Sequence, residues 1–275
     1  MNLLGKRTVI VIGDKKIQLN EFKRMVFSYK SILENIQYRE ITVLLELNSH
    51  TIALIYAALL LGLHVNIVKN IGETHNIYKD FIDEKEIVKK VHKDFKMKFY
   101  KEDSEIALNF NGEKISYEEL KGVIRRTRRN YGRDEVIYSN DLEKMSSLCI
   151  GLIIPIYLEY LIIFNDNIQK IFKDYKPTIF IVKRRKVKNL YTLLFSFTKK
   201  NKIKEFLYSF LKDWDNGVLN IFINKWILFK KFRALKMIII EEKNDLNGLW
   251  LDFESLGIEI FSKKIVLEKD IKADY

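Results

Sequence analysis

The chain has 275 residues, of which 48% are hydrophobic, 13% aromatic and 31% charged. This is the balance of an ordered globular protein and excludes a disordered or collagen-like chain. The net charge is +12. A single cysteine, Cys149, excludes an intramolecular disulfide and a thiolate zinc site, and none of the four histidines has a metal-ligand spacing. We therefore expect no metal.

The first predicted unit is a β-hairpin followed by a helix. Apolar residues 8–12 and residues 16–19 flank Gly13 and Asp14, a pair typical of a turn. Asn20 is expected to cap a helix whose apolar positions have helical spacing. The N-terminal apolar run stops at Gly13, too soon for a signal-peptide core.

The next unit reads as strand, helix and strand. Residues 41–47 are nearly all apolar and rich in β-branched side chains, as in a strand covered on both faces. Asn48 or Ser49 caps a helix over residues 50–61, Gly62 ends it, and residues 64–68 form the next strand. Such a βαβ unit implies a right-handed crossover in a largely parallel sheet.

The second half repeats this alternation. Residues 105–110 predict a strand, Asn111-Gly112 a turn, and Ser116 with Glu119 a capping box that opens a helix over residues 117–130. Residues 187–232 look mostly helical. Further strands are predicted at 135–138, 160–164, 178–182, 236–240 and 258–261, and further helices at 142–156, 167–174 and 247–256. The predicted class is α/β, with largely parallel sheets flanked by helices.

Two apolar stretches, residues 51–68 and 145–164, are near the minimum length of a membrane span. Each also parses as a buried helix followed by a buried strand. The second contains Pro155 and Glu159, and a carboxylate at mid-bilayer costs about 2.5 kcal/mol or more. We expect no transmembrane span and a cytoplasmic protein.

Several segments, in order, resemble the adenylate-forming (AMP-binding) superfamily of acyl- and aryl-CoA synthetases. Asn48, Ser49 and Gly62 fall on that family's Asn-Ser helix cap and helix end. The other segments that carry the resemblance are residues 9–22, 134–139, 148–158, 168–188, 235–240 and 253–261. The resemblance implies the family's N-terminal fold over residues 1–275, as one domain or as two α/β subdomains of about 1–100 and 101–275. It also implies that the C-terminal domain with the catalytic lysine is absent.

The family's catalytic motifs are not matched. Its Ser/Thr/Gly-rich phosphate loop, which grips ATP with backbone amides and hydroxyls, corresponds here to Asn109, Asn111, Gly112 and Lys114, with Glu113 where phosphate would sit. We interpret these residues as a vestigial nucleotide loop reduced to a turn. Residues 141–144, Glu241-Glu242 and residues 261–265 replace the family's other adenylation motifs. The resemblance thus predicts no catalytic residues and no cofactor.

The sequence favours a non-catalytic accessory or binding protein, present as a homodimer or as the partner subunit of a ligase or biosynthetic assembly. Residues 226–232 and 265–271 are the candidate interfaces, unless they fold back onto the core. A divergent active ligase, with Lys114 and Lys144 binding phosphate and ATP and magnesium as cofactors, is one alternative.

The other alternative is a peripheral membrane or polyanion-binding protein that uses Arg125, Arg126, Arg128 and Arg129. A second basic cluster is Lys183-Arg184-Arg185-Lys186. Lysine and isoleucine are abundant and alanine is scarce, a sign of A/T-rich codons, so most of the basic residues are expected to be solvated surface. We expect no dedicated nucleic-acid site.

Overall fold

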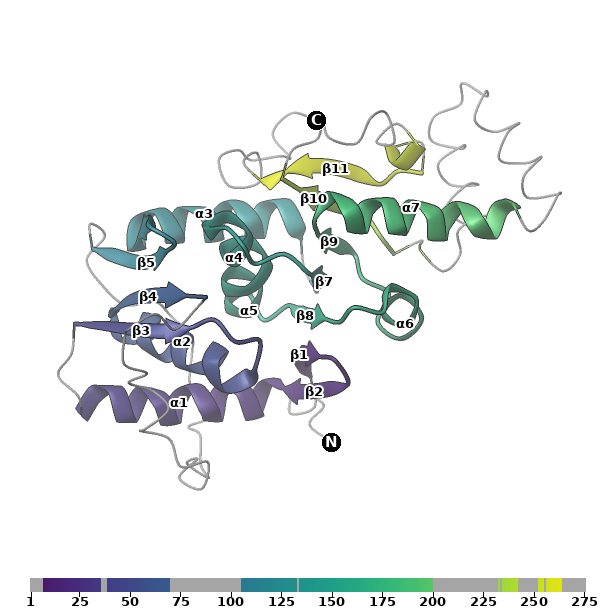
Figure 1. The fold of residues 1–275 in the computed structure, drawn as a ribbon. Coiled ribbons are helices and arrows are strands. Elements are labelled where there is room, and N and C mark those ends of the chain that lie inside the picture. The colour runs from purple at the N-terminus through teal and green to yellow at the C-terminus, as the bar shows by residue number, and fades with distance from the viewer. Residues whose placement is uncertain are drawn as a thin grey trace.

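Two β-sheets share the helices around them in the computed structural model of the chain (Figure 1). The structure describes residues 7–35, 39–69, 105–132, 134–199, 232, 234–241, 252–254 and 256–263. Between residues 134 and 199, it describes side chains only as far as residue 193. The predictions for residues 200–231, 247–251, 255 and 265–271 lie outside the described residues. Phe232, part of one predicted interface, is buried and packs on Phe172 with ring centroids 4.3 Å apart.

The larger sheet has seven strands in the order β11-β10-β9-β7-β8-β1-β2. All neighbours pair in parallel except β1 and β2, which form the predicted N-terminal hairpin. The strands are β1 (Thr8–Ile12), β2 (Lys15–Gln18), β7 (Val136–Ser139), β8 (Leu161–Phe164), β9 (Ile179–Ile181), β10 (Met237–Ile240) and β11 (Glu259–Ser262).

The smaller sheet has four strands in the order β3-β4-β5-β6. Strands β3 (Glu40–Leu44), β4 (His64–Val68) and β5 (Ile106–Phe110) are parallel, and β6 (Glu113–Ser116) returns antiparallel to β5. Each sheet therefore takes strands from both sides of residue 100. The α/β class with largely parallel sheets is confirmed.

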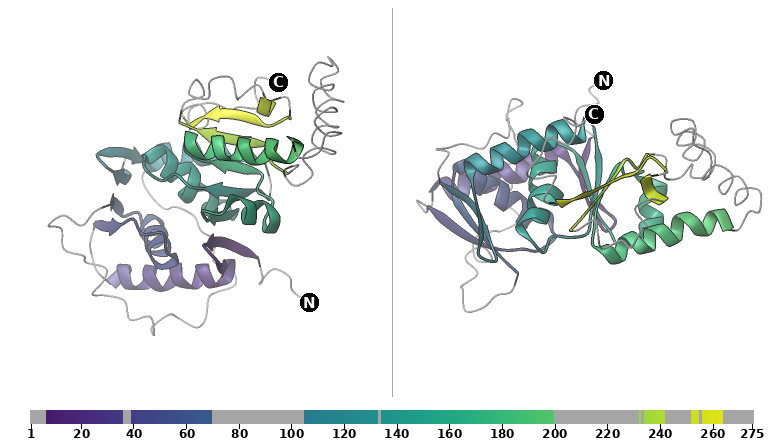
Figure 2. Two further views of the ribbon diagram at one scale, coloured as in Figure 1. Left: turned by 45° about the vertical axis from the view of Figure 1, so that its right-hand side comes forward. Right: turned by 90° about the horizontal axis from the view of Figure 1, so that it is seen from above.

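Helices cover both faces of the larger sheet (Figure 2). Side chains of α6 (Ile168–Asp174) and α7 (Arg184–Lys199) pack with one face. On the other face, β1, β2 and β8 share one hydrophobic core with the smaller sheet, α1 (Leu19–Asn35), α2 (Ser49–Leu61), α3 (Tyr117–Tyr131) and the segment from α4 (Met145–Leu148) to α5 (Ile154–Tyr157). This common core joins the two sheets. Side chains of β7, β9 and β10 on that face form a separate cluster with Tyr131 and Ile150.

Local signals fix several helix ends. Asn48 caps α2 by accepting a hydrogen bond from the Thr51 amide at 2.8 Å, and Gly62 ends the helix with a left-handed φ of 75°. Ser116 and Glu119 form the predicted capping box of α3. Asn20 is not a cap, because α1 already begins at Leu19. Strand β3 ends at Leu44, three residues earlier than predicted, because tight backbone turns from Leu44 to Asn48 follow it.

The predicted helix over 142–156 starts later, at Met145, and is interrupted. Residues Cys149–Ile153 form a π-helical turn between α4 and α5, and the Ile154 amide bonds to the Cys149 carbonyl. Pro155 has no amide hydrogen and cannot bond to the carbonyl four residues back, which favours a local widening of the helix. Among the described residues, no helix is long and apolar enough to cross a membrane.

Candidate functional site

The candidate site lies at the carboxyl ends of the parallel strands. From β7 the chain crosses to β8 on one side and then to β9 on the other, so the strand order reverses between β7 and β9. In open parallel sheets, ligands bind beside the carboxyl ends of strands at such a reversal. The loop of residues 140–144, which follows β7, lies at this position.

A buried lysine occupies this edge. Lys263 directly follows β11, is 1% exposed, and donates to Asp141 Oδ2 at 2.5 Å, to Ser147 Oγ at 2.6 Å and to Glu241 Oε2 at 3.1 Å. Asp141 follows β7 and Glu241 follows β10, so three strand ends converge on one ammonium group. We call Lys263, Asp141, Ser147 and Glu241 the Lys263 cluster.

Further ion pairs continue outward from the cluster. Lys144 Nζ lies 2.7 Å from Glu241 Oε1, and Lys183 pairs with Glu143. Partial burial alone would raise the pKa of Glu241, but hydrogen bonds from Lys144 and Lys263 outweigh it and hold the pKa below its ordinary value. Positive and negative groups therefore compensate one another along this edge.

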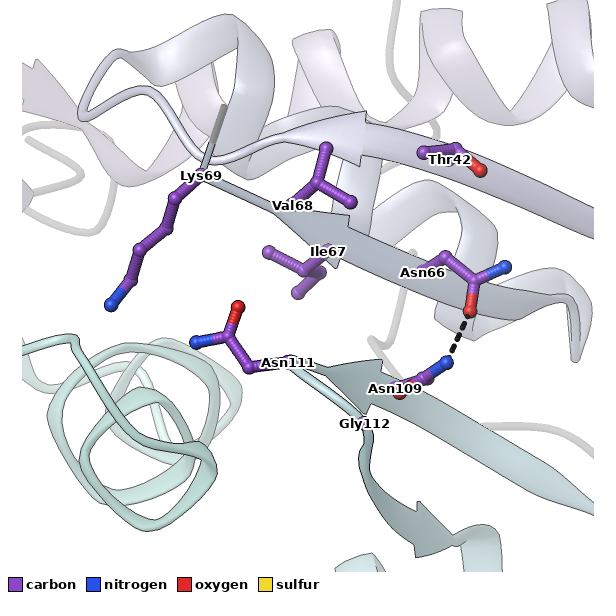
Figure 3. Close-up of a pocket in the computed structure, with 8 residues that line it drawn as sticks. All are labelled: Thr42, Asn66, Ile67, Val68, Lys69, Asn109, Asn111 and Gly112. Carbon is purple, nitrogen blue, oxygen red and sulfur yellow. Dashed lines mark hydrogen bonds between the residues drawn. The ribbon is translucent and has the colours of Figure 1, made fainter. Parts of the chain in front are cut away.

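A pocket of about 600 Å³ opens beside the same loop, at the carboxyl end of the smaller sheet (Figure 3). Three asparagines, one threonine and one lysine supply its polar lining, together with apolar atoms of β4. The lining residues are Thr42, Asn66, Ile67, Val68, Lys69, Asn109, Asn111 and Gly112.

Amide side chains form a directed row across this sheet. Ionised Glu40 can only accept, so Asn66 donates its amide to Glu40 and accepts from Asn109 Nδ2 at 2.9 Å. Asn109 Oδ1 is buried at the end of the row and accepts no hydrogen bond within the described residues. The pocket wall thus offers neutral polar groups, and Lys69 is the only charged residue among the described residues that line it.

The loop after β7 connects the pocket to the Lys263 cluster. The backbone carbonyl of Glu143 accepts from Lys69 Nζ at 3.0 Å and from Asn111 Nδ2 at 3.5 Å. The Glu143 side chain pairs with Lys183, which lies two residues after β9 of the larger sheet. Pocket and cluster are therefore two parts of one site, formed by the carboxyl edges of both sheets.

The structure brings together three of the four residues predicted as a vestigial nucleotide loop. Asn109, Asn111 and Gly112 line the pocket, whereas Lys114 is exposed on β6 and does not. Asn111 and Gly112 have φ values of 54° and 84°, as in the two-residue turn of a tight hairpin. That these residues derive from a nucleotide loop stays a prediction.

The predicted arginine patch lies elsewhere, on α3. Arg125, Arg128 and Arg129 are exposed, while Arg126 is partly buried, with its guanidinium 3.5 Å from the position of a Cβ on Gly122. None of the four lines the pocket. Cys149 is fully buried in the π-helical turn, and burial raises the pKa of its thiol to about 12, so it is not a thiolate nucleophile.

The sequence did not predict the Lys263 cluster. In the sequence, Asp141, Glu241 and Lys263 stand out only as departures from the family's catalytic motifs. The sequence still offers a way to predict that these three residues lie close together. Each follows the end of a predicted parallel strand, and the carboxyl ends of parallel strands lie at one edge of the sheet.

No protein-family model matches the sequence, and no curated protein matches it. Solved structures do match the fold. The o-succinylbenzoate coenzyme A synthetase from Bacillus subtilis in complex with AMP is 11% identical with a TM-score of 0.53, over 93% of this chain and 69% of that one. The unliganded form of the same enzyme is 12% identical with a TM-score of 0.56, over 93% and 57%.

A fatty acyl-adenylate ligase from L. pneumophila, in complex with acyl adenylate and pyrophosphate, is 10% identical with a TM-score of 0.51, over 92% of this chain and 50% of that one. The fold is therefore that of the N-terminal domain of adenylate-forming enzymes. The chain spans between half and about two thirds of these three solved chains, and identities this low show the fold and not the reaction.

Proposed function

We propose that this chain is a binding or accessory protein that has the adenylate-forming fold but does not adenylate. The Lys263 cluster carries the proposal. Fully buried charges persist only when paired, and Lys263 is held by two carboxylates at the sheet edge where a ligand of a parallel sheet binds. An anionic nucleotide at this edge would have to displace Lys263 or lie beside Asp141 and Glu241.

The hairpin of β5 and β6 supports the same proposal. Gripping a triphosphate requires several backbone amides and hydroxyls directed at its oxygens. Here only Asn111 and Gly112 connect the two strands, and Glu113 follows them. The binding capacity of the protein is instead assigned to the amide-lined pocket, whose ligand does not need to be anionic.

The test is calorimetric titration with ATP and magnesium, together with ATP–pyrophosphate exchange in the presence of fatty or aryl acids. We expect binding no tighter than millimolar and no exchange. The Bacillus subtilis o-succinylbenzoate coenzyme A synthetase, solved in complex with ATP and magnesium, provides the positive control. A micromolar constant or acid-dependent exchange would instead identify a divergent ligase.

The proposal includes a cytoplasmic location and association with a second copy or with a subunit of a ligase or biosynthetic assembly. Light scattering and a pull-down at micromolar concentration test the association. One chain has a mass of 32.8 kDa, so a monomer of about that mass with no recovered partner would contradict the proposed association.

A further inference from the structure

The amide row on the smaller sheet has a fixed direction. Thr42, Asn66 and Asn109 lie opposite one another on β3, β4 and β5, so their side chains leave the same face of the sheet. Glu40 anchors the row, because an ionised carboxylate can only accept, and His64 Nδ1 lies 3.3 Å from its other oxygen. Asn66 donates to Glu40, and Asn109 donates to Asn66. The acceptor end of the row is therefore Asn109 Oδ1.

Asn109 Oδ1 is the unfilled position of this row. It is buried, and it accepts no hydrogen bond from any described residue. A buried acceptor without a donor is costly, and the hydrogen bonds before it in the row increase its negative partial charge. Because Asn109 lines the pocket, a ligand in the pocket can supply the missing donor. A ligand that carries only acceptors, such as a carboxylate, would place oxygen against oxygen.

The other polar side of the pocket carries positive charge. Lys69 and Asn111 both donate to the Glu143 carbonyl. Figure 3 shows these two side chains on the opposite side of Ile67 from Asn109. The carbonyl is neutral and does not cancel the charge of Lys69, so a cationic donor such as an ammonium group would be repelled. Between the two polar sides, Ile67 supplies an apolar surface.

We propose, resting on the binding role assigned to this pocket under the proposed function, that its ligand is an uncharged carboxamide joined to an apolar group. The ligand N–H donates to Asn109 Oδ1 and so adds one more amide to the row. The ligand oxygen accepts from donors that line the pocket, such as the Thr42 hydroxyl, and the apolar group packs on Ile67 and Val68. A volume of about 600 Å³ is in the range of small-molecule sites.

Probes that share one aromatic ring test this proposal by NMR titration of the isotope-labelled protein. Benzamide has the donor and the acceptor side by side, whereas acetophenone has the same shape without the donor. Benzoate is the anion of the same shape, benzylammonium is a cation, and benzyl alcohol donates through a hydroxyl. We expect benzamide to bind at about millimolar concentration and to shift the side-chain amide signals of Asn66 and Asn109. The other probes should bind about tenfold more weakly.

Protein variants assign the preference to the row. Asn109→Ala removes the acceptor, so benzamide should bind about tenfold more weakly while acetophenone is little affected. Asn20→Ala is the matched control, because Asn20 is exposed on α1 and does not line the pocket. Glu40→Gln allows the anchor to donate, so the row can reverse and end in an N–H group. The preference for benzamide over acetophenone should then decrease.

Equal affinity for benzamide and acetophenone, tighter binding of any charged probe or of benzyl alcohol, equal losses in the two alanine variants, or no binding of benzamide would each overturn the proposal. If Asn109→Ala does not fold, as thermal unfolding shows, the comparison of probes on the unchanged protein decides. Micromolar binding of ATP would contradict the proposed function. Loss of the benzamide preference without such binding would contradict only the carboxamide ligand.

Discussion

Gly151 shows how one residue ties the interrupted helix to the larger sheet. A Cβ built on Gly151 would lie 2.5 Å from Ser139 Oγ and 3.5 Å from Ser139 Cβ. Ser139 is fully buried at the end of β7, and within the described residues its hydroxyl has no hydrogen-bond partner. The absence of a side chain at residue 151 therefore allows the π-helical turn to pack directly on β7.

We predict that Gly151→Ala destabilises the protein by about 1–3 kcal/mol, the usual cost of overpacking, reduced by the better helix propensity of alanine. Ser139→Ala alone should have a small effect, because the lost hydroxyl makes no hydrogen bond. In the double variant the nearest atoms become Leu142 Cδ2 at 3.4 Å and the Cβ of residue 139 at 3.5 Å, which are ordinary contacts, so stability should recover. Urea denaturation of the unchanged protein, the two single variants and the double variant measures the free energies of unfolding. If Gly151→Ala costs the same with serine and with alanine at residue 139, a clash with Ser139 Oγ is excluded.

Lys263 provides the second prediction at the residue scale. Replacing it with methionine leaves Asp141 buried without its counter-ion, which costs about 3–5 kcal/mol. Adding Asp141→Asn removes the uncompensated charge, so the double variant should be more stable than Lys263→Met alone.

The matched control for Lys263 is Lys144→Met. Lys144 also pairs with Glu241 but is 56% exposed, so its loss should cost about 1 kcal/mol or less. Chemical denaturation compares the variants. Similar costs for the two lysines would mean that burial does not set the strength of the Lys263 cluster.

At the scale of elements, α2 is the clearest case of a helix defined by its caps. It is apolar on all sides and almost wholly buried, so no amphipathic pattern marks its ends. Asn48 and Gly62 mark them instead. The sequence predicts Gly62 as the helix end and either Asn48 or Ser49 as the cap, because a cap requires only the local chain, and the structure shows that the cap is Asn48.

We predict that Asn48→Ala lowers the free energy of unfolding by about 1 kcal/mol, since the Thr51 amide loses its acceptor. Asn48→Ser keeps an acceptor and should cost much less. Equilibrium denaturation provides the measurement. Equal effects of the two substitutions would show that the cap hydrogen bond contributes little.

At the scale of the whole molecule, carboxylates paired with lysines couple stability to pH. Hydrogen bonding to Lys186 holds the pKa of Asp166 below its ordinary value of 3.8, and hydrogen bonds from Lys144 and Lys263 do the same for Glu241. A carboxyl with a lower pKa in the folded state binds protons more readily when unfolded. Its stabilisation is present at neutral pH and is lost as the pH falls through the folded-state pKa.

We therefore expect the thermal unfolding temperature to decrease as the pH falls from about 6 to about 3. The variant D166N/E241Q should be less stable at neutral pH and should show a shallower decrease. Calorimetry across this range checks both points. If the unfolding temperature of the variant falls with pH as steeply as that of the unchanged protein, other carboxylates cause the acid sensitivity.

The sequence by itself determined the features that depend on neighbouring residues. These include the Gly13-Asp14 and Asn111-Gly112 turns, a helix cap at Asn48 or Ser49, the Ser116 capping box and the parallel βαβ unit. Each follows from backbone conformation or from a hydrogen bond spanning a few residues. The order and spacing of these units also gave the fold class.

Only the tertiary structure decided which side chains meet. Lys263 and Asp141 are 122 positions apart, and Asn66 and Asn109 are 43 apart. The contact of Gly151 with Ser139 and the widened turn before Pro155 likewise depend on how the helix meets β7. Burial gives such contacts their energetic weight, since a buried charge or amide must find a partner wherever the fold brings one. The residues that neighbour such a group in the sequence do not indicate which partner that is.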